Sequence, residues 1–561
     1  MKKTWKSLLA VAVMLFGAGV GSAQDTQTVA VVSVSGYDNL LKSIATIGES
    51  AGKPGLDRMI GAFIDLGTGG KGLAGVDKTK PWGVQVIMTE QGPAGIGFIP
   101  VTDVKQLLAA LSAQAGEAED VGDGVFALSD GPAPTFVKEQ GGWAFVAQTK
   151  EQLATLPADP IQLLDGLNTK YAVAARAYVQ NIPEPMRQMA VEQMRSGFEG
   201  AMQPIEGESK EDYELRKNAA EQSLKQLERV VNETDTVTFG WAVDNANKQT
   251  YIDVALTAVP GTMLAKSMAN KAGASDFAGF MMDGAAFALH INAEAETTEA
   301  DKAQVETQMG ALRDRVYVEL DKDRSIPAEA KATLKEAIGE IFDVLTESLK
   351  SGKADGGAVV LGDPKLNAVA GGRVADGKAI EAALKKIGKV AAEDPEAPEI
   401  NWDAETYKGF TFHHLSMPAP DEDARRLMGD NLQIAAAASN NGVYVAAGSD
   451  AVGTIKKVID ASATAAGQET PPMQMIVSLG EVMKIASQAQ PDDQNVQMMS
   501  AMLAQMQGSD RVRIIASSIE NGANYRLSVD EGVIKLIGQA AAMAGGGGAG
   551  QAPQQFGPGG F

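Results

Sequence analysis

The chain has 561 residues, a formal net charge of −22 and no cysteine. The lack of thiols excludes disulfide scaffolds, thiolate metal centres and cysteine nucleophiles. The acidity argues against nucleic-acid binding, which needs a basic face. An apolar fraction of 45% is ordinary for a chain that folds. The length suits roughly two to four domains of about 100–200 residues each.

Residues 1–23 have the three parts of a secretory signal peptide. A basic start is followed by an apolar core at 8–20 and by small residues at 21–23, so we expect cleavage after Ala23. The core is shorter than the about 20 residues that a membrane span needs. We therefore expect a secreted or periplasmic protein with no integral membrane span after cleavage.

Four later segments repeat one pattern, in which two apolar stretches flank a polar turn and a helix follows. Alternating apolar and polar residues indicate half-buried strands, and Gly, Asn, Asp or Pro between them indicates a hairpin turn. The hairpins are expected at 82–99, 237–256, 358–370 and 512–529. An opening strand is expected before each hairpin, at 29–34, 172–179, 285–291 and 473–477.

The first and third repeats carry extra strands. These are expected at 124–128, 135–138 and 143–147, and again at 407–416, 432–438 and 443–447. The alternation of long and short repeats indicates that one two-part block was duplicated. We therefore predict an α+β fold with two homologous halves, 24–275 and 280–543, each an antiparallel sheet of hairpins with helices packed on one face. Paired hairpins argue against a doubly wound nucleotide fold.

Proline and low-complexity sequence divide the rest of the chain. Long helical stretches are expected at 184–231, broken at Pro204, and at 299–349, interrupted at Pro327, because proline cannot continue a helix. Residues 545–561 are mainly Gly, Ala, Pro and Gln, and we expect them to form a disordered tail.

Three short motifs resemble known sites, but each departs from the pattern that its chemistry needs. Residues 321–332 begin like a calcium loop, but Ile326 replaces the required glycine. The Gly-rich run 67–72 lacks the first glycine and the Ser/Thr of a phosphate loop. Ser50 and Lys53 have Ser-x-x-Lys spacing without the companion motifs of penicillin-recognising enzymes. We expect a structural role for all three.

The three histidines are His290, His413 and His414. His290 lies at the end of an opening strand, whereas His413 and His414 are neighbours in a strand and must point to opposite faces. Acids at 421–423 are close in sequence, and imidazole with carboxylate suits zinc, manganese or iron. The interpretation that we favour is structural, because no metal-ligand spacing such as His-x-x-x-His occurs.

Methionines recur at helical spacing. One group is Met186 and Met189, and a second is at 498, 499, 502 and 506. Thioethers bind Cu(I), but apolar residues at this period more often fill a core, or an adaptable groove for a lipid or a partner helix.

The segment Gly142–Ala147, Gly-Trp-Ala-Phe-Val-Ala, is echoed by Gly442–Ala447, Gly-Val-Tyr-Val-Ala-Ala. With these echoes and the hairpin–helix pattern, the chain resembles a loose group of exported bacterial proteins of unknown function that have a leader and repeated strand–helix blocks. The resemblance implies no catalytic residue and no substrate.

These patterns favour an exported, non-catalytic protein that binds a partner or has a structural role in the cell envelope. They assign no catalytic residue, cofactor or metal, leave the ligand-binding residues unknown, and speak against a nucleic-acid partner. One alternative is a periplasmic protein that binds an amphiphile between the sheet and the Met-rich helices. Another is a metal-assisted hydrolase around His413 or His414.

Overall fold

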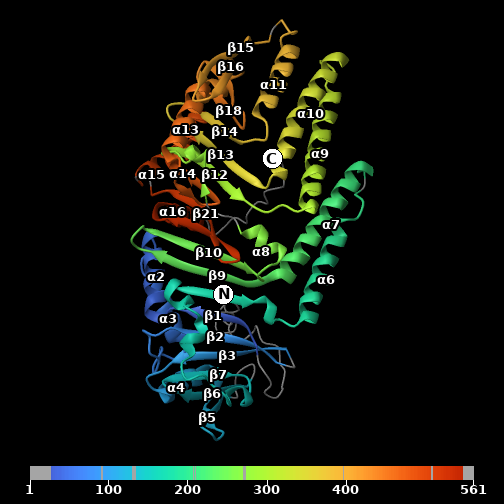
Figure 1. The fold of residues 1–561 in the computed structure, drawn as a ribbon. Coiled ribbons are helices and arrows are strands. Elements are labelled where there is room, and N and C mark those ends of the chain that lie inside the picture. The colour runs from blue at the N-terminus through green and yellow to red at the C-terminus, as the bar shows by residue number, and fades with distance from the viewer. Residues whose placement is uncertain are drawn as a thin grey trace.

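The computed structural model describes residues 27–89, 92–128, 134–205, 207–208, 210–269, 273–395, 397–506 and 509–546. The predicted leader 1–23 lies outside these residues, as does the predicted tail beyond Gly546. In the described chain, antiparallel strands form one long sheet with helices around it (Figure 1), which confirms the α+β class.

Twenty strands of the described chain pair into this sheet, and every pairing is antiparallel. The N-terminal strands run from one edge to the centre in the order β4 (Ala118–Asp120), β5 (Val125–Leu128), β6 (Thr135–Gln140), β7 (Trp143–Ala147), β3 (Gly92–Pro100), β2 (Trp82–Thr89), β1 (Thr28–Val34), β8 (Val173–Tyr178), β9 (Thr234–Asp244) and β10 (Gln249–Ala258).

The sheet continues without interruption into the C-terminal part of the chain, because β10 pairs with β22. From this central pair outward the order is β22 (Gly522–Asp530), β21 (Arg511–Ile519), β20 (Met473–Ser478), β12 (Ala285–Glu294), β13 (Lys353–Leu361), β14 (Asn367–Arg373), β18 (Gly442–Gly448), β17 (Asn431–Ala438), β16 (Phe410–Pro418) and β15 (Ile400–Tyr407).

The pairing order is the same on both sides of the centre. We name the described residues up to 269 the N-terminal half, those from 273 the C-terminal half, and the β10–β22 pairing the seam. In each half the opening strand β1 or β12 lies beside the hairpin that follows it in the chain, and beside the opening strand β8 or β20 of the next repeat. The predicted opening strands and hairpins are therefore confirmed as elements and as pairs.

Helices fill the same intervals of the chain in both halves. A helical pair follows each opening strand, namely α2 (Tyr37–Ser50) with α3 (Leu56–Gly67), α6 (Glu184–Ala201) with α7 (Lys210–Glu233), α9 (Glu299–Lys322) with α10 (Ala328–Lys350), and α14 (Leu479–Ala489) with α15 (Gln494–Ala504). A single helix follows each hairpin, namely α4 (Val104–Ala115), α8 (Met263–Met268), α11 (Gly377–Ala391) and α16 (Glu531–Gly546). Pro204 and Pro327 separate the two long pairs as predicted.

In Figure 1 the pairs α6–α7 and α9–α10 stand along one side of the sheet, and α2, α3 and α13 to α16 along the other. The helix α13 (Ala451–Ala465) follows β18, and the short 3₁₀ helix η1 (Glu151–Leu153) has the corresponding place after β7. Shorter connecting elements are α5 (Leu167–Lys170), α12 (Glu422–Met428), η2 (Pro160–Leu164), η3 (Val179–Asn181), η4 (Ala278–Phe280) and the pair β11 (Gly273–Ala274) and β19 (Glu469–Thr470).

Apolar packing covers both faces of the sheet, which differs from the expectation of helices on one face. Tyr444 belongs to the core cluster that contains Ile455 and Val458 of α13, whereas its neighbour Val443 packs with Ile380 of α11 and Val344 of α10. Adjacent strand residues point to opposite faces. We name the two faces the α13 face and the α11 face.

The N-terminal half shows the same division. Phe145 packs on the α13 side with Leu153 of η1, and its neighbour Ala144 packs with Leu107 of α4. The apolar sequence pattern identified the buried strand residues but could not show that α4 and α11 lie on the second face.

Two details of the chain path differ from the expected boundaries. Of the stretch 407–416, expected as one strand, residues 410–416 do lie in β16. Tyr407 instead ends β15, and Lys408 and Gly409, with φ values of 46° and 87°, form a two-residue turn between the two strands. Gly273 and Ala274 pair with β19, so these residues pack with the C-terminal half.

Among the residues that the structure describes, no helix has both the length and the apolar character to cross a bilayer.

Candidate functional site

The described chain brings one set of possible metal ligands together, formed by Glu381, Asp403 and His413, whose ligand atoms lie within 4.8 Å of one another. Glu381 comes from the first turns of α11, Asp403 from β15 and His413 from β16. His413 is opposite Ala436 and is only 3% exposed, whereas His414 is opposite Ala435 of the core on the α13 face. The two histidines therefore point to opposite faces, as predicted.

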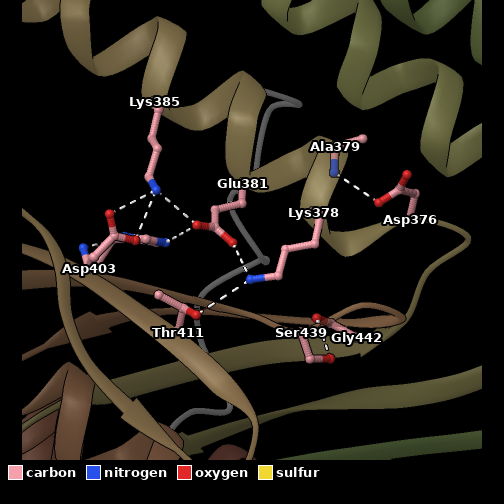
Figure 2. A network of polar contacts seen from close by, with 10 residues as sticks. Asp376, Lys378, Ala379, Glu381, Lys385, Asp403, Thr411, Ser439 and Gly442 are labelled. Atoms are coloured by element: carbon pink, nitrogen blue, oxygen red, sulfur yellow. Dashed lines mark hydrogen bonds and ion pairs between the residues drawn. The ribbon is translucent and has the colours of Figure 1, made fainter.

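Two lysines complete this cluster (Figure 2). Lys385 Nζ lies 2.9 Å from Glu381 Oε1 and 2.9 Å from Asp403 Oδ1, between the two carboxylates. Lys378 Nζ lies 2.7 Å from Glu381 Oε2. Two ammonium groups thus balance two carboxylates, and Lys385 has the bridging position that a metal ion would take.

The protonation of His413 also bears on metal binding. The backbone N–H of Asp403 donates to His413 Nδ1 at 3.0 Å, so Nδ1 is an acceptor and the proton of the neutral ring is on Nε2. Nε2 lies 3.5 Å from Glu381 Oε1. A protonated Nε2 has no lone pair for a metal, and we therefore interpret the cluster as an ionic contact that joins α11 to the outer strands.

The pKa shifts agree with this interpretation. Burial tends to raise the pKa of Glu381, but the hydrogen bonds from Lys378 and Lys385 outweigh burial and lower it. The hydrogen bond from Lys385 lowers the pKa of Asp403. Burial lowers the pKa of His413, which favours the neutral ring.

The acids near the histidines in sequence have other roles. Asp421 caps α12 by accepting from the Ala424 N–H at 2.7 Å, and Glu422 lies 2.7 Å from Arg426. Neither contacts a histidine. The acids that do approach His413 were missed, although Glu381 carries a sequence signal: it is an acid beside the apolar Ile380 in a helical pattern, with lysines three residues before it and four after it.

A second polar cluster contains Ser275, His290 and Asp355, the residue types of a hydrolase triad. Ser275 Oγ lies 2.5 Å from Asp355 Oδ1 and 2.9 Å from His290 Nε2, and it accepts from the Phe277 N–H at 2.9 Å. Because the hydroxyl proton goes to Asp355, His290 Nε2 must donate to Oγ and cannot take its proton. Ser275 is 1% exposed and His290 is 0% exposed.

This second cluster therefore holds the chain between the halves onto the C-terminal half. Burial tends to raise the pKa of Asp355, but hydrogen bonds from His290 and Ser275 outweigh it and lower the pKa. The cluster has the composition of a catalytic site, but its hydrogen bonds run in the wrong direction for catalysis.

The other sequence motifs lie apart from these clusters. The Gly-rich run 67–72 borders an open hollow of about 280 Å³, which Asp65 and Lys78 also line. Lys71 in this run donates to the Ala109 carbonyl at 2.7 Å. The Ser50 hydroxyl donates to the Thr46 carbonyl at 2.9 Å, an ordinary helical contact.

Residues 321–332 also have structural contacts. Asp321 lies 2.7 Å from Lys335, and Asp323 accepts from the Ser325 N–H at 2.9 Å. In the second methionine group, Met498 and Met499 are 49% and 38% exposed, so this face of α15 is not part of the core. The buried residue of that helix is Leu503.

The centre of the α11 face carries an exposed apolar row. Ala175, Phe239, Val254 and Tyr525 are directly opposite one another on β8, β9, β10 and β22. Phe239, Val254 and Tyr525 are 49%, 40% and 46% exposed, and Leu527, two residues along β22, is 36% exposed. We name these five residues the central stripe. The central stripe crosses the seam. Alternation of apolar residues along a strand could not show that these side chains are exposed rather than part of the core.

Comparison of the chain with family models, with curated proteins and with solved structures found no match.

Proposed function

We propose that this protein is an exported, non-catalytic binding scaffold and that the central stripe is the surface that contacts its partner. The observation that carries the proposal is the stripe itself. Its large side chains, Phe239 and Tyr525, lie on the two strands that flank β10, each directly opposite Val254. Contiguous exposed apolar surface on a folded protein is typical of interaction sites.

The polar clusters support the non-catalytic part of the proposal. The Ser275 hydroxyl donates to a carboxylate, and the proton of His413 is on the nitrogen that faces Glu381. In both places polar and charged groups from different elements pair with one another and help to hold those elements together. For the amphiphile alternative, the hollow beside Asp65 and Lys78 has a charged lining rather than the apolar one that such a ligand needs.

We also infer that the two halves descend from one duplicated block. The identical pairing order supports this, as does a shared detail of the helices that follow β3 and β14. Asp103 caps α4 through the Lys105 N–H at 2.9 Å, and Asp376 caps α11 through the Ala379 N–H at 2.9 Å. The leader predicted from the sequence at 1–23 supports export.

A site-specific photocrosslinker tests the binding surface. A photoreactive phenylalanine analogue is placed at Phe239 or Tyr525 in cells that export the protein, with the same analogue at Ile537 of α16 as the control. Ile537 is 61% exposed and apolar but lies off the stripe. We expect one adduct of the same mass from both stripe positions and none from Ile537.

The adduct must also depend on the stripe. Replacing Val254 and Leu527 with serine should abolish crosslinking from Phe239 without changing the thermal unfolding midpoint by more than a few degrees, because both side chains are already partly exposed. Equal adducts from all three crosslinker positions, or no adduct from the stripe, would contradict the proposal.

A further inference from the structure

The seam has a charge pair at its centre, with a buried aspartate and a partly exposed arginine. Asp253 of β10 is directly opposite Arg526 of β22, with Arg526 Nε 2.7 Å from Asp253 Oδ1 and Nη2 2.8 Å from Oδ2. The Asp253 side chain is fully buried. The Tyr171 hydroxyl donates to Asp253 Oδ2 at 2.8 Å, and the Arg526 guanidinium lies 3.9 Å from the centre of the Tyr251 ring.

These two charges occupy the same position in the two halves. Asp103 and Asp376 cap equivalent helices, so counting back from them aligns the residues of β3 with those of β14. The strand registers then give the equivalent residues on each following strand up to the seam. The row Gly97, Val84, Val32, Ala175, Phe239 and Val254 then corresponds to the row Ala370, Ala358, Leu289, Met475, Ile514 and Leu527. Asp253 precedes Val254, and Arg526 precedes Leu527.

Because equivalent positions face each other, each half presents a nearly self-complementary edge at the seam. A second copy of the chain could pair its β10 with this β10 in the same register. That arrangement would place Asp253 opposite its own copy, and pairing of two β22 strands would place Arg526 opposite its own copy. Like charges directly opposite each other on paired strands are unfavourable, most of all at the buried Asp253.

We propose that the Asp253–Arg526 pair selects the pairing of the two halves within one chain over the pairing of like halves from two copies of this chain. Each half carries one sign of charge at the central position, so only unlike halves match. The partner excluded by this device is a second copy of the protein, and the excluded product is a dimer joined through β10–β10 and β22–β22.

The first test removes both charges of the pair, and the only other cation within 4 Å of Asp253 among the described residues is the exposed Lys170, 3.7 Å away. With Asp253→Asn and Arg526→Gln, neutral hydrogen-bonding groups are opposite each other whether β10 pairs with β22 in one chain or like strands of two chains pair. The mature chain is unfolded in denaturant and refolded at micromolar concentration, and mass is measured by size exclusion with light scattering. We expect wild-type protein to refold as a monomer, and the dimer fraction of the variant to be at least about tenfold higher.

A matched control is available in the same half of the sheet. Arg513 of β21 lies 2.5 Å from Asp530 of β22, an ion pair of the same kind that does not cross the seam. Arg513→Gln with Asp530→Asn should leave the protein monomeric after refolding. Equal dimer fractions for the seam and control variants would overturn the proposal, as would a seam variant that refolds only as a monomer.

The second test uses complementary charges. Arg526→Asp gives a chain with two central acids, and Asp253→Arg gives one with two central bases. Alone, each has like charges in every arrangement, and neither should dimerise. Refolded together, they should form a one-to-one dimer, detected by a mass tag on one chain. If the mixture contains no mixed dimer, the proposal fails. If either single variant does not fold, the dimer fraction of the neutral double variant in the first test decides.

Discussion

At the scale of single residues, the polar groups of this protein show how partners determine a role. His290 and His413 are both buried imidazoles near carboxylates, and one ring nitrogen of each is hydrogen-bonded, in His290 to the Ser275 hydroxyl and in His413 to the Asp403 N–H. Sequence could identify the histidines and the opposite orientation of His413 and His414. It could not identify Glu381 and Asp403 as neighbours of His413, because that contact depends on how α11 packs against the outer strands.

The burial of His413 predicts a pH dependence of stability. Its pKa is lower in the folded protein than the value of about 6.5 in an unfolded chain. The unfolded state therefore binds more protons just below that pH, and stability should fall as pH falls through about 6.5 towards the lower folded pKa. Denaturant unfolding at a series of pH values measures this effect.

His413→Asn is the matched variant, because the asparagine oxygen can accept from the Asp403 N–H in place of Nδ1. We expect a smaller loss of stability between about pH 6.5 and 5 in this variant than in the wild type. An unchanged pH profile would show that His413 is not the group responsible.

Tyr171 allows a second test at this scale. Gly240 leaves room for its ring, since a Cβ at that position would lie 2.5 Å from the ring, and the hydroxyl reaches the buried Asp253. Tyr171→Phe should lower the free energy of unfolding by about 1–3 kcal/mol, because the hydrogen bond is to a charged group. Tyr251→Phe is the control, since its hydroxyl makes only a 3.5 Å contact with Lys170, and a change within about 0.5 kcal/mol is expected. Equal losses would refute the special role of Tyr171.

At the scale of elements, local sequence signals determine most of the strands and helix ends. The N-cap Asp376 begins α11, the helix that carries Glu381. Asp376→Ala should cost about 1 kcal/mol of stability, whereas Asp376→Asn keeps an acceptor and should cost less. Unfolding curves of the two variants check this, and equal losses would mean that the side-chain cap is not the cause.

Some of these elements could be predicted from the sequence alone, and others could not. Alternation and turn residues predicted the openers and hairpins, because each hairpin carries its own turn chemistry and half-buried faces. The sequence pattern missed β15 and the turn that joins it to β16, because this turn depends on Lys408 adopting a positive φ, which lysine rarely does. The two-sided placement of helices depends on long-range packing, which alternation along a strand cannot specify.

At the scale of the whole molecule, the seam joins residues that are far apart in the chain. Val254 and Tyr525 face each other across it and are both exposed. Val254→Cys with Tyr525→Cys should form an intramolecular disulfide in this cysteine-free chain. A faster band on a non-reducing gel and an unfolding midpoint that falls on reduction would show it. Closing a loop of this length should stabilise the protein by about 6 kcal/mol in the chain-entropy estimate.

A hairpin cross-link is the control for this experiment. Phe239→Cys with Val254→Cys joins directly opposed residues within the N-terminal half and closes a short loop. Its stabilisation should be smaller, about 3 kcal/mol. A hairpin pair that cross-links while the seam pair does not would contradict the continuous sheet.

The two outer edges also limit how the molecule can grow. β4 has three residues, and β15 is interrupted by an irregularity between Asn401 and Glu405, with exposed acids along it. Short and charged edge strands resist addition of further strands. Association with other copies is therefore expected at the faces of the sheet rather than by extension of its edges.

The length of the sheet has a geometric consequence for any rigid partner. With twenty strands about 4.8 Å apart, the sheet extends over about 90 Å. Each strand is rotated by about 20–25° from the one before it, so the surface turns through about a quarter circle within four or five strands. A flat body pressed against the middle would lose contact beyond that arc, and the four strands β8, β9, β10 and β22 fit within it. The two ends of the same face are oriented in other directions because of the twist. They can therefore contact different binding partners at the same time.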